Sequence, residues 1–282
     1  MEQKLIISVD STADLSPELC ARFDIRVVPV TVTLGEDSFP DTPDFSPEMI
    51  YARYRKDGTL PQTASPSLQT LTDYFSTFTA QGYQVVHLDV SAELSGTCGA
   101  ARIAAAELDG VYVVDSRSLC QGIALLAIQA AQYRDEGMTA PEIVARLETL
   151  RDKVDTSFVL DSLEFMRKGG RCSGIAALGA NLLKLKPALE MADGKLRVYK
   201  KYRGPDRTVL RSYVRERLAG KTVRPGVVIL SHSGEADSAI MDELDALVRE
   251  LCPGAEIIHG LAGCTICSHC GPKTVAVFFI NE

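Results

Sequence analysis

The sequence of 282 residues contains no tryptophan, only four histidines, and 6% aromatic residues. It has no uninterrupted apolar run near the roughly 20 residues that a membrane-spanning helix needs. The opening MEQKLIISVDSTADL has an apolar run too short for the core of a signal peptide, so we expect a cytoplasmic protein. A formal net charge of −7 gives no overall attraction for nucleic acid or anionic membranes, and we expect neither as a partner.

Two nucleotide-binding motifs are incomplete. GKT at 220–222 would need a glycine five residues before Gly220 to form a phosphate loop, and Arg215 stands there. GGRCSG at 169–174 has Arg171 where a dinucleotide-binding turn needs a second glycine, which lets the backbone approach the pyrophosphate. We therefore expect no ATP site, no nicotinamide and no other cofactor.

Hydrophobic residues make up 46% of the chain, enough for the cores of two ordinary domains. Short β-branched runs alternate with amphipathic segments, a pattern typical of α/β layers on a largely parallel sheet. The predicted strands are LIISVD (5–10), RVVPVTVTL (26–34), QVVHLDV (84–90), VYVVDS (111–116), SFVLDS (157–162), GVVILSHS (226–233), AEIIHG (255–260) and TVAVFFI (274–280).

One segment departs from this alternation. PALEMADGKLRVYKKYRG (187–204) has two alternating runs around Asp193-Gly194, which predicts a β-hairpin within a second, mixed sheet. We place the domain boundary near Lys153, between a long predicted helix and the strand that follows. The expected organisation is an N-terminal α/β domain, residues 1–153, and a C-terminal mixed α/β domain, residues 154–282.

Hydroxyl-rich loops mark the expected binding site. SAELSGT (91–97) turns from a strand into a helix, and its glycine, free N–H groups and hydroxyls suit a small anion at a helix N-terminus. PQTASPS (61–67) and DSTADL (10–15) are similar loops at or near strand ends. Because ligands bind at the carboxyl ends of strands in doubly wound proteins, we also select His232 and His269, which follow strands.

Eight motifs together span essentially the whole chain: DSTADL, PQTASPS, SAELSGT, VVDSRSLCQG (113–122), LEFMRKGGR (163–171), LLKLKPALEMADGKL (182–196), KKYRG (200–204) and SHCGPK (268–273). In this order and register they resemble the motifs of the DegV family of bacterial fatty-acid-binding proteins. The resemblance implies a non-enzymatic, two-domain α/β protein that encloses one long-chain fatty acid. It further implies an apolar tunnel in the second domain, a carboxylate held between domains, and an ATP-dependent kinase partner that makes acyl-phosphate.

The resemblance also implies roles for individual residues. Thr63 and Ser95 would hydrogen-bond the carboxylate, and His269 would lie at its edge. Supporting positions in the same loops are Ser65, Gly96 and Thr97. Arg171 and Arg203 match arginines at the pocket mouth that serve phosphoryl transfer or kinase docking. Two positions depart from the family pattern, because Lys273 replaces a usual glycine and Ala64 a usual serine.

In the second domain, apolar residues are candidates for the tunnel wall, and basic residues are candidates for contact with a partner or a phosphate. The candidate tunnel walls, each of which could equally be ordinary core, are Phe158, Leu160, Leu163, Phe165, Ile175, Leu178, Leu182 and Leu189. Basic residues crowd the predicted hairpin, against the overall acidity, and suit a solvated face, an acidic partner or an acyl-phosphate. They are Lys195, Arg197, Lys200, Lys201, Arg203 and Arg207.

Two alternative functions start from other residues. A serine hydrolase would use Ser95 as nucleophile and His269 as base, although no carboxylate orienter is identifiable. A metal or redox sensor would use Cys264, Cys267 and Cys270. We expect no metal there, because a fourth ligand is missing and adjacent His269 and Cys270 would point apart in an extended segment. The eight cysteines are expected to be reduced thiols.

Overall fold

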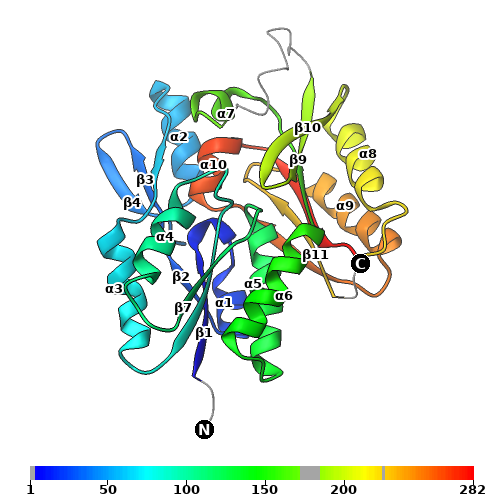
Figure 1. The fold of residues 1–282 in the computed structure, drawn as a ribbon. Helices are drawn as coiled ribbons and strands as arrows, with labels where there is room; N and C mark the ends of the chain where they lie inside the picture. The colour runs from blue at the N-terminus through cyan, green and yellow to red at the C-terminus, as the bar shows by residue number, and fades with distance from the viewer. Residues whose placement is uncertain (1–3, 172–184, 224–225) are drawn as a thin grey trace.

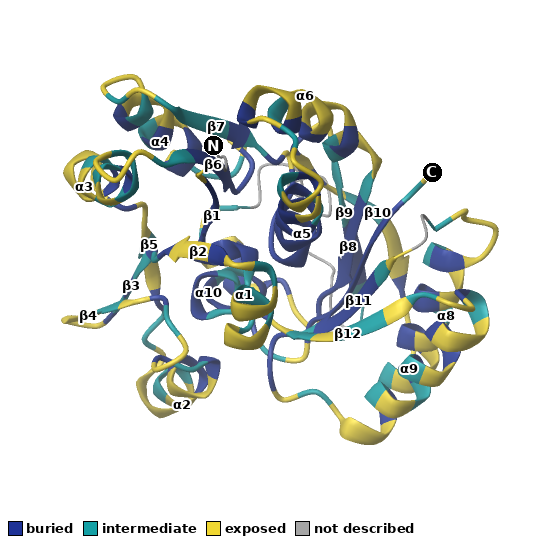
Figure 2. Ribbon diagram, turned by 90° about the horizontal axis from the view of Figure 1, so that it is seen from below, coloured by how far each residue is buried: buried dark blue, intermediate teal, exposed yellow. Residues whose placement is uncertain are grey.

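The computed structural model describes residues 4–171, 185–223 and 226–282. Its largest sheets lie on either side of a buried helix, as Figures 1 and 2 show. The chain completes the first sheet before residue 116 and builds the second entirely from residues after 153. A mixed α/β fold with one parallel and one mixed sheet is therefore confirmed.

The first sheet is parallel and has the strand order β2-β1-β6-β7. The buried runs predicted at 5–10 and 84–90 form its two central strands, paired with Ile7 opposite Val86. The strands are β1 (Leu5–Asp10), β2 (Ile25–Val28), β6 (Gln84–Asp89) and β7 (Val111–Asp115). The short helices of this part are η1 (Ser11–Ala13), α1 (Pro17–Phe23), α3 (Leu68–Thr79) and α4 (Thr97–Ala105). Parallel pairing brings the loops after β1 and β6 to one edge.

The predicted strand at 26–34 is divided in two. β2 ends at Val28, and β3 (Thr31–Leu34) belongs to a separate antiparallel sheet of order β4-β3-β5. Pro29 lies at the break, and proline cannot donate a hydrogen bond to a sheet ladder. The other strands of this small sheet and the helix between them are β4 (Asp37–Pro40), α2 (Pro47–Asp57) and β5 (Gln62–Ala64). After the break the chain leaves the parallel sheet, and the small sheet includes β5, which carries Thr63.

The second sheet is mixed, with six strands in the order β10-β9-β8-β13-β11-β12. The predicted hairpin is confirmed, since β9 and β10 pair antiparallel and Asp193 and Gly194 both take positive φ at the turn. The strands are β8 (Val154–Val159), β9 (Lys186–Ala192), β10 (Lys195–Tyr202), β11 (Val227–His232), β12 (Glu256–Leu261) and β13 (Val275–Ile280). The helices α8 (Asp206–Leu218) and α9 (Ser238–Leu251) pack on one face of this sheet.

Helix α5 (Gln121–Asp135) lies between the two large sheets (Figure 2). Its sequence is apolar around most of its circumference, and eleven of its fifteen residues are buried. One core cluster includes residues of both sheets and of α5. The two halves of the chain therefore share a core. The neighbouring helices are α6 (Ala140–Leu150) and η2 (Arg151–Lys153).

The segment expected to be extended at 264–270 is the helix α10 (Cys264–Cys270), so that prediction was wrong. The Asp41 carboxylate accepts hydrogen bonds from the backbone N–H groups of Cys264 and Thr265, at 2.9 and 3.1 Å. An acidic side chain distant in sequence thus stabilises the first turn of the helix. α7 (Glu164–Lys168) packs against α10, where a side chain on Gly271 would collide with Phe165.

Candidate functional site

A cavity of about 160 Å³ opens where the loops of the parallel sheet meet α10 and the mixed sheet. Its polar lining includes Thr12, Thr63, Ser65, Ser95, Thr97, Thr265, Arg171 and His269. Its apolar lining includes Val30, Val90, Leu94, Leu119, Phe158, Met166, Leu196 and Ile266. Both halves of the chain contribute to each set, so the cavity lies between them.

Three hydroxyl groups gather at the N-terminus of α4. The Thr97 Oγ1 lies 2.8 Å from both the Ser65 and the Ser95 Oγ, and the Ser65 and Ser95 Oγ atoms are 3.4 Å apart. Gly96 is the N-cap residue of α4, and its lack of a side chain leaves the helix without a capping side-chain hydrogen bond. Rotatable hydroxyls beside a helix N-terminus can all donate to one anion.

A fourth hydroxyl pairs with the histidine of α10. The Thr63 Oγ1 is 3.0 Å from His269 Nε2, and both residues line the cavity. Burial, and then the nearby Arg171 guanidinium, lower the pKa of His269 to about 4. The imidazole is therefore neutral at pH 7 and can act as one donor and one acceptor.

The first glycine of the pair in LEFMRKGGR, Gly169, provides the room for this histidine. A Cβ on Gly169 would lie 2.4 Å from His269 Nδ1 and 3.0 Å from the Phe165 carbonyl oxygen. His269 Nδ1 is buried and has no hydrogen-bond partner among the described residues. Arg171 follows this glycine pair in the chain, and its Nη1 donates a hydrogen bond to the Gly169 carbonyl oxygen at 2.8 Å. The close approach of this turn to α10 thus fixes where the imidazole lies.

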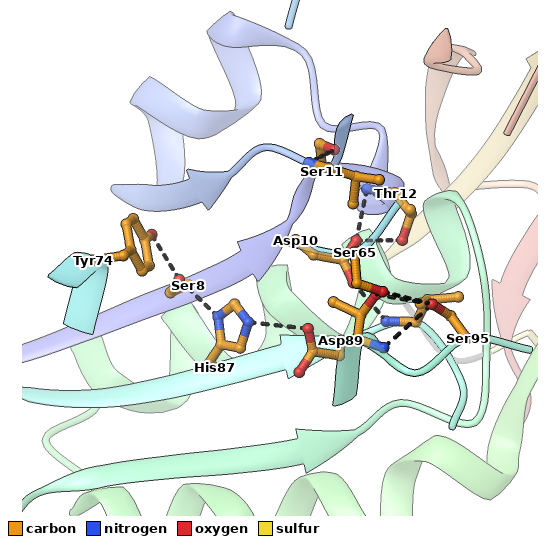
Figure 3. A network of polar contacts seen from close by, with 12 residues as sticks. Ser8, Asp10, Ser11, Thr12, Ser65, Tyr74, His87, Asp89 and Ser95 are labelled. Carbon is orange, nitrogen blue, oxygen red and sulfur yellow. Dashed lines mark hydrogen bonds and ion pairs between the residues drawn. The ribbon is translucent and has the colours of Figure 1, made fainter. Parts of the chain in front are cut away.

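Asp10 joins two walls of the cavity, a role that sequence reasoning missed (Figure 3). Its Oδ1 accepts from the Thr12 N–H at 2.7 Å and from the Thr12 hydroxyl, while its Oδ2 accepts from the Val90 N–H at 2.9 Å. Burial, and then the neighbouring Asp89, raise the pKa of Asp10 to about 7. The available signal was its place in DSTADL, directly after a buried strand.

Behind Asp10, a line of polar side chains crosses the parallel sheet (Figure 3). Ser8 Oγ lies 2.8 Å from the Tyr74 hydroxyl and 2.9 Å from His87 Nδ1, and His87 Nε2 lies 3.1 Å from Asp89 Oδ1. His87 is fully buried, and each of its ring nitrogens has a side-chain hydrogen-bond partner.

The structure brings together most of the predicted site residues. Thr63, Ser65, Ser95, Gly96, Thr97, Arg171 and His269 all line the cavity. Arg203 does not; it is exposed in the loop between β10 and α8. His232 lines a separate, smaller cavity, and its Nδ1 accepts from the Gly234 N–H at 3.0 Å.

The predicted tunnel walls have different locations. Phe158 lines the cavity, whereas the other predicted wall residues that the structure describes are buried in the shared core. These are Leu160, Leu163, Phe165 and Leu189. Ile175, Leu178 and Leu182 lie outside the described residues.

The two departures from the family pattern differ in their consequences. Lys273 takes φ of 59°, a left-handed conformation in which glycine avoids the strain of a side chain. Its backbone N–H still donates to the Gly234 carbonyl at 3.1 Å. Ala64 lines the cavity beside Thr63, so it replaces a hydroxyl with a methyl group in the wall.

The basic residues of the hairpin are mostly paired with acidic side chains. Arg197 bonds Glu190, Lys200 bonds Glu216, and Lys195 lies 3.4 Å from Glu93. Arg207 pairs with Glu243 at 3.3 Å. Within residues 4–171, 185–223 and 226–282, the side chains of Lys201 and Arg203 have neither a hydrogen bond nor an ion pair. Of the basic residues expected to form a positively charged patch, only these two side chains are not neutralised by an acidic partner within the described residues.

The described residues do not form the arrangements that a serine hydrolase or a metal site would need. His269 Nε2 contacts Thr63, whereas the Ser95 hydroxyl contacts Ser65 and Thr97, so the serine–histidine pair of a hydrolase is not formed. Among the described residues, no three His, Cys, Asp or Glu side chains are grouped to hold a metal ion. The seven described cysteines are free thiols. No helix in the described ranges is both long and apolar enough to cross a membrane.

Known proteins share this length and fold. The model of the DegV family, described as that of an uncharacterised protein, matches residues 4–282. A Thermotoga maritima protein named fatty acid-binding protein is 30% identical over 280 residues, 96% of this chain and 96% of its own. A DegV domain-containing protein of Clostridium perfringens is 28% identical over 281 residues, 99% of both chains.

Solved structures give the same result. A Thermus thermophilus DegV family protein, described by its fatty acid binding, has a TM-score of 0.88 and 28% identity, over 99% of this chain and 100% of its own. The Streptococcus pneumoniae fatty acid kinase B3 protein, loaded with linoleic acid, has a TM-score of 0.85 over 99% of this chain and 100% of its own. Its 18% identity shows the shared fold alone.

Proposed function

Because the chain belongs to the DegV family, we propose that it binds one long-chain fatty acid in the cavity and presents the carboxylate to a partner kinase. The observation that carries this proposal is the composition of the cavity wall. The wall combines hydroxyl groups and His269 with apolar side chains from both halves of the chain. An amphipathic ligand with one anionic end matches that composition.

The hydroxyl groups suit a carboxylate because a buried anion without donors is energetically expensive. The hydroxyls of Thr63 and Ser95 come from different loops and could each donate to one carboxylate oxygen. Ser65, Gly96 and Thr97 support the Ser95 side, and the neutral His269 supports Thr63. Arg171 adds positive charge at the cavity without a carboxylate partner among the described residues.

The apolar walls provide the affinity. Each methylene of an acyl chain that leaves water contributes ~0.8 kcal/mol, so a chain of ~14 methylenes gains about 11 kcal/mol before ordering costs. Phe158, Leu196 and Ile266 come from the half of the chain after residue 153. We assign residues 1–153 and 154–282 to two domains that enclose the ligand together.

The relatives named for fatty acid binding and the fold shared with a fatty acid kinase protein support a substrate-presenting role. In that role the chain binds lipid and supplies no catalytic residue, nucleotide site or cofactor. The kinase supplies ATP and transfers phosphate to the carboxylate. Arg203, exposed and unpaired in the described part of the chain, is suited to contact the kinase or the phosphate.

Mass spectrometry of the purified protein tests lipid binding. Native spectra should show one added fatty acid per chain, which denaturing spectra lose and organic extraction recovers. Protein that was delipidated should regain the same mass increment on incubation with a long-chain fatty acid. A chain that carries no lipid after expression and acquires none on incubation would refute the proposed function.

A further inference from the structure

A pair of buried thiols forms part of the cavity wall and takes no part in holding a carboxylate. Cys267 and Cys270 lie one turn apart on α10. Cys270 lines the main cavity and also a second, apolar cavity of about 30 Å³ that shares Leu119, Phe158 and Ile266 with it. Cys270 is only 6% exposed and Cys267 is fully buried, so a reagent held in the cavity has better access to Cys270 than one in bulk solvent.

The surroundings of the two sulfur atoms differ. The Cys267 thiol donates to the Ser233 and Ala262 carbonyl oxygens at 3.5 and 3.3 Å, and the Cys270 thiol donates to the Gly271 carbonyl oxygen at 3.5 Å. The neighbouring Cys267 thiol is the main cause of a lowered pKa at Cys270, in spite of burial. Burial instead raises the pKa of Cys267. Cys270 lines the cavity while Cys267 is fully buried, so Cys270 is the thiol that a ligand in the cavity meets, and Cys267 remains a protonated thiol beside it.

A third thiol lies at the same small cavity. Cys120 lines that cavity, and its sulfur is 2.8 Å from Asp14 Oδ2. Burial raises the pKa of Asp14 well above its usual range. Cys120 itself is held at φ 54° and ψ −143°, a conformation rare for a residue with a side chain, which fixes its thiol against Asp14.

We propose that Cys270 reduces the hydroperoxide group of an oxidised unsaturated fatty acid held in the cavity, with Cys267 as the resolving thiol. This inference rests on the proposed lipid site, because the acyl chain must bring the hydroperoxide to α10. The oxidised fatty acid would bind through the same apolar contacts as the unoxidised one. It does not require the partner kinase.

The reaction balances in two steps. The Cys270 thiol gives its proton to solvent, the resulting thiolate attacks the terminal oxygen of the hydroperoxide, the O–O bond breaks, and the departing alkoxide takes one proton back from solvent to become an alcohol. Cys270 is then a sulfenic acid. The Cys267 sulfur attacks the Cys270 sulfur, a disulfide forms, and the hydroxyl leaves as water. For each hydroperoxide reduced, the two thiols together lose two electrons and become one disulfide. Further turnover needs an external dithiol to reduce that disulfide.

The end of α10 permits the disulfide. Cβ atoms three residues apart on a helix are roughly 5–6 Å apart, so they must approach by about 1–2 Å to form a disulfide. Cys270 is the last residue of α10, and Gly271 follows it with φ of 72°. The last turn can therefore tighten without disturbing Cys264, whose N–H is held by Asp41.

The test uses delipidated full-length protein, reduced and then freed of reductant, with equal concentrations of linoleic acid hydroperoxide or hydrogen peroxide. Peptide mass spectrometry follows the Cys267–Cys270 disulfide, and chromatography follows the hydroxy fatty acid. The lipid hydroperoxide should form the disulfide at least about tenfold faster, because binding raises its effective concentration. Unoxidised linoleic acid should compete and slow the reaction.

Variants separate the roles of the two thiols. Cys267→Ser should stop at a Cys270 sulfenic acid, which dimedone traps, and Cys270→Ser should lose alcohol formation. Cys252→Ser, at a thiol in the second core cluster, should behave as wild type. Equal rates with both peroxides, or alcohol formation by Cys270→Ser, would overturn the inference. If linoleic acid binds but neither thiol is oxidised, this inference fails alone; if linoleic acid does not bind, the proposed function fails with it.

Discussion

The Thr63 hydroxyl lies 3.0 Å from His269 Nε2, although 206 positions separate the two residues in the sequence. The contact joins β5, in the small sheet, to α10, which follows the last parallel strand of the second sheet. It places a neutral imidazole and a hydroxyl together in the wall of the cavity that Ser95 also lines. The predictions below test what each part of this wall does.

Removing the His269 imidazole should change how stability depends on pH. The pKa of His269 is lowered from 6.5 to about 4, so the unfolded chain binds the extra proton between these values. The stability due to neutral His269 is therefore complete above pH 6.5 and is lost as the pH falls through 4. The difference in unfolding free energy between wild type and His269→Gln should shrink by ~2–3 kcal/mol over that range. Urea unfolding at several pH values measures it, and a constant difference would contradict a buried neutral imidazole.

Adding one methyl group at Gly169 should weaken lipid binding. Its φ of −75° is open to any residue, so Gly169→Ala acts only through the new Cβ, 2.4 Å from His269 Nδ1. The imidazole must then move away from Thr63, and we expect affinity for a fluorescent fatty acid to fall about tenfold, the effect of one lost hydrogen bond. Gly99→Ala is the matched control, because a Cβ there meets no atom within 4 Å. Equal affinity in both variants would show that the position of His269 does not matter for binding.

Arg203 should separate binding from phosphorylation. It lies outside the cavity lining, so Arg203→Ala should keep its fatty acid while acyl-phosphate formation by a cognate kinase falls. Added salt should weaken the wild-type reaction, because contacts between exposed charges are screened. Lipid occupancy and turnover of labelled fatty acid are measured together, with Arg215→Ala on α8 as a control for the lost charge. A proportional loss of lipid and turnover would make Arg203 a ligand-binding residue.

The fold was predictable wherever local pattern and tertiary structure agree. The alternating runs at 187–204 became β9 and β10, and the buried runs became the sheet strands. Pro29 indicates the break between β2 and β3, but the continuous apolar pattern on both sides of it predicts a single strand. Helix α10 had no such local signal, because its cap is Asp41, more than two hundred residues earlier in the chain.

The site was predictable in part for the same reason. The loops with Thr63 and Ser95 have recognisable composition, and parallel strands bring such loops to one edge. The role of Asp10 depends on Val90, which only the pairing of β1 with β6 places nearby. The ion pairs that neutralise Arg197 and Lys200 also depend on strand and helix packing, so composition alone overstated the basic patch.

The affinity of the double variant Thr63→Ala, Ser95→Ala for a fatty acid tests the carboxylate cradle most directly. Two hydrogen bonds to a charged group contribute ~1.5–3 kcal/mol each, so the dissociation constant should rise by well over tenfold. Thr33→Ala, whose hydroxyl bonds Ser38 in the same small sheet as β5, serves as the control and should bind as wild type. Titration with a fluorescent fatty acid, after thermal unfolding shows the variants folded, gives the numbers. A double variant that binds as tightly as wild type would contradict the assignment of these two hydroxyls to the carboxylate.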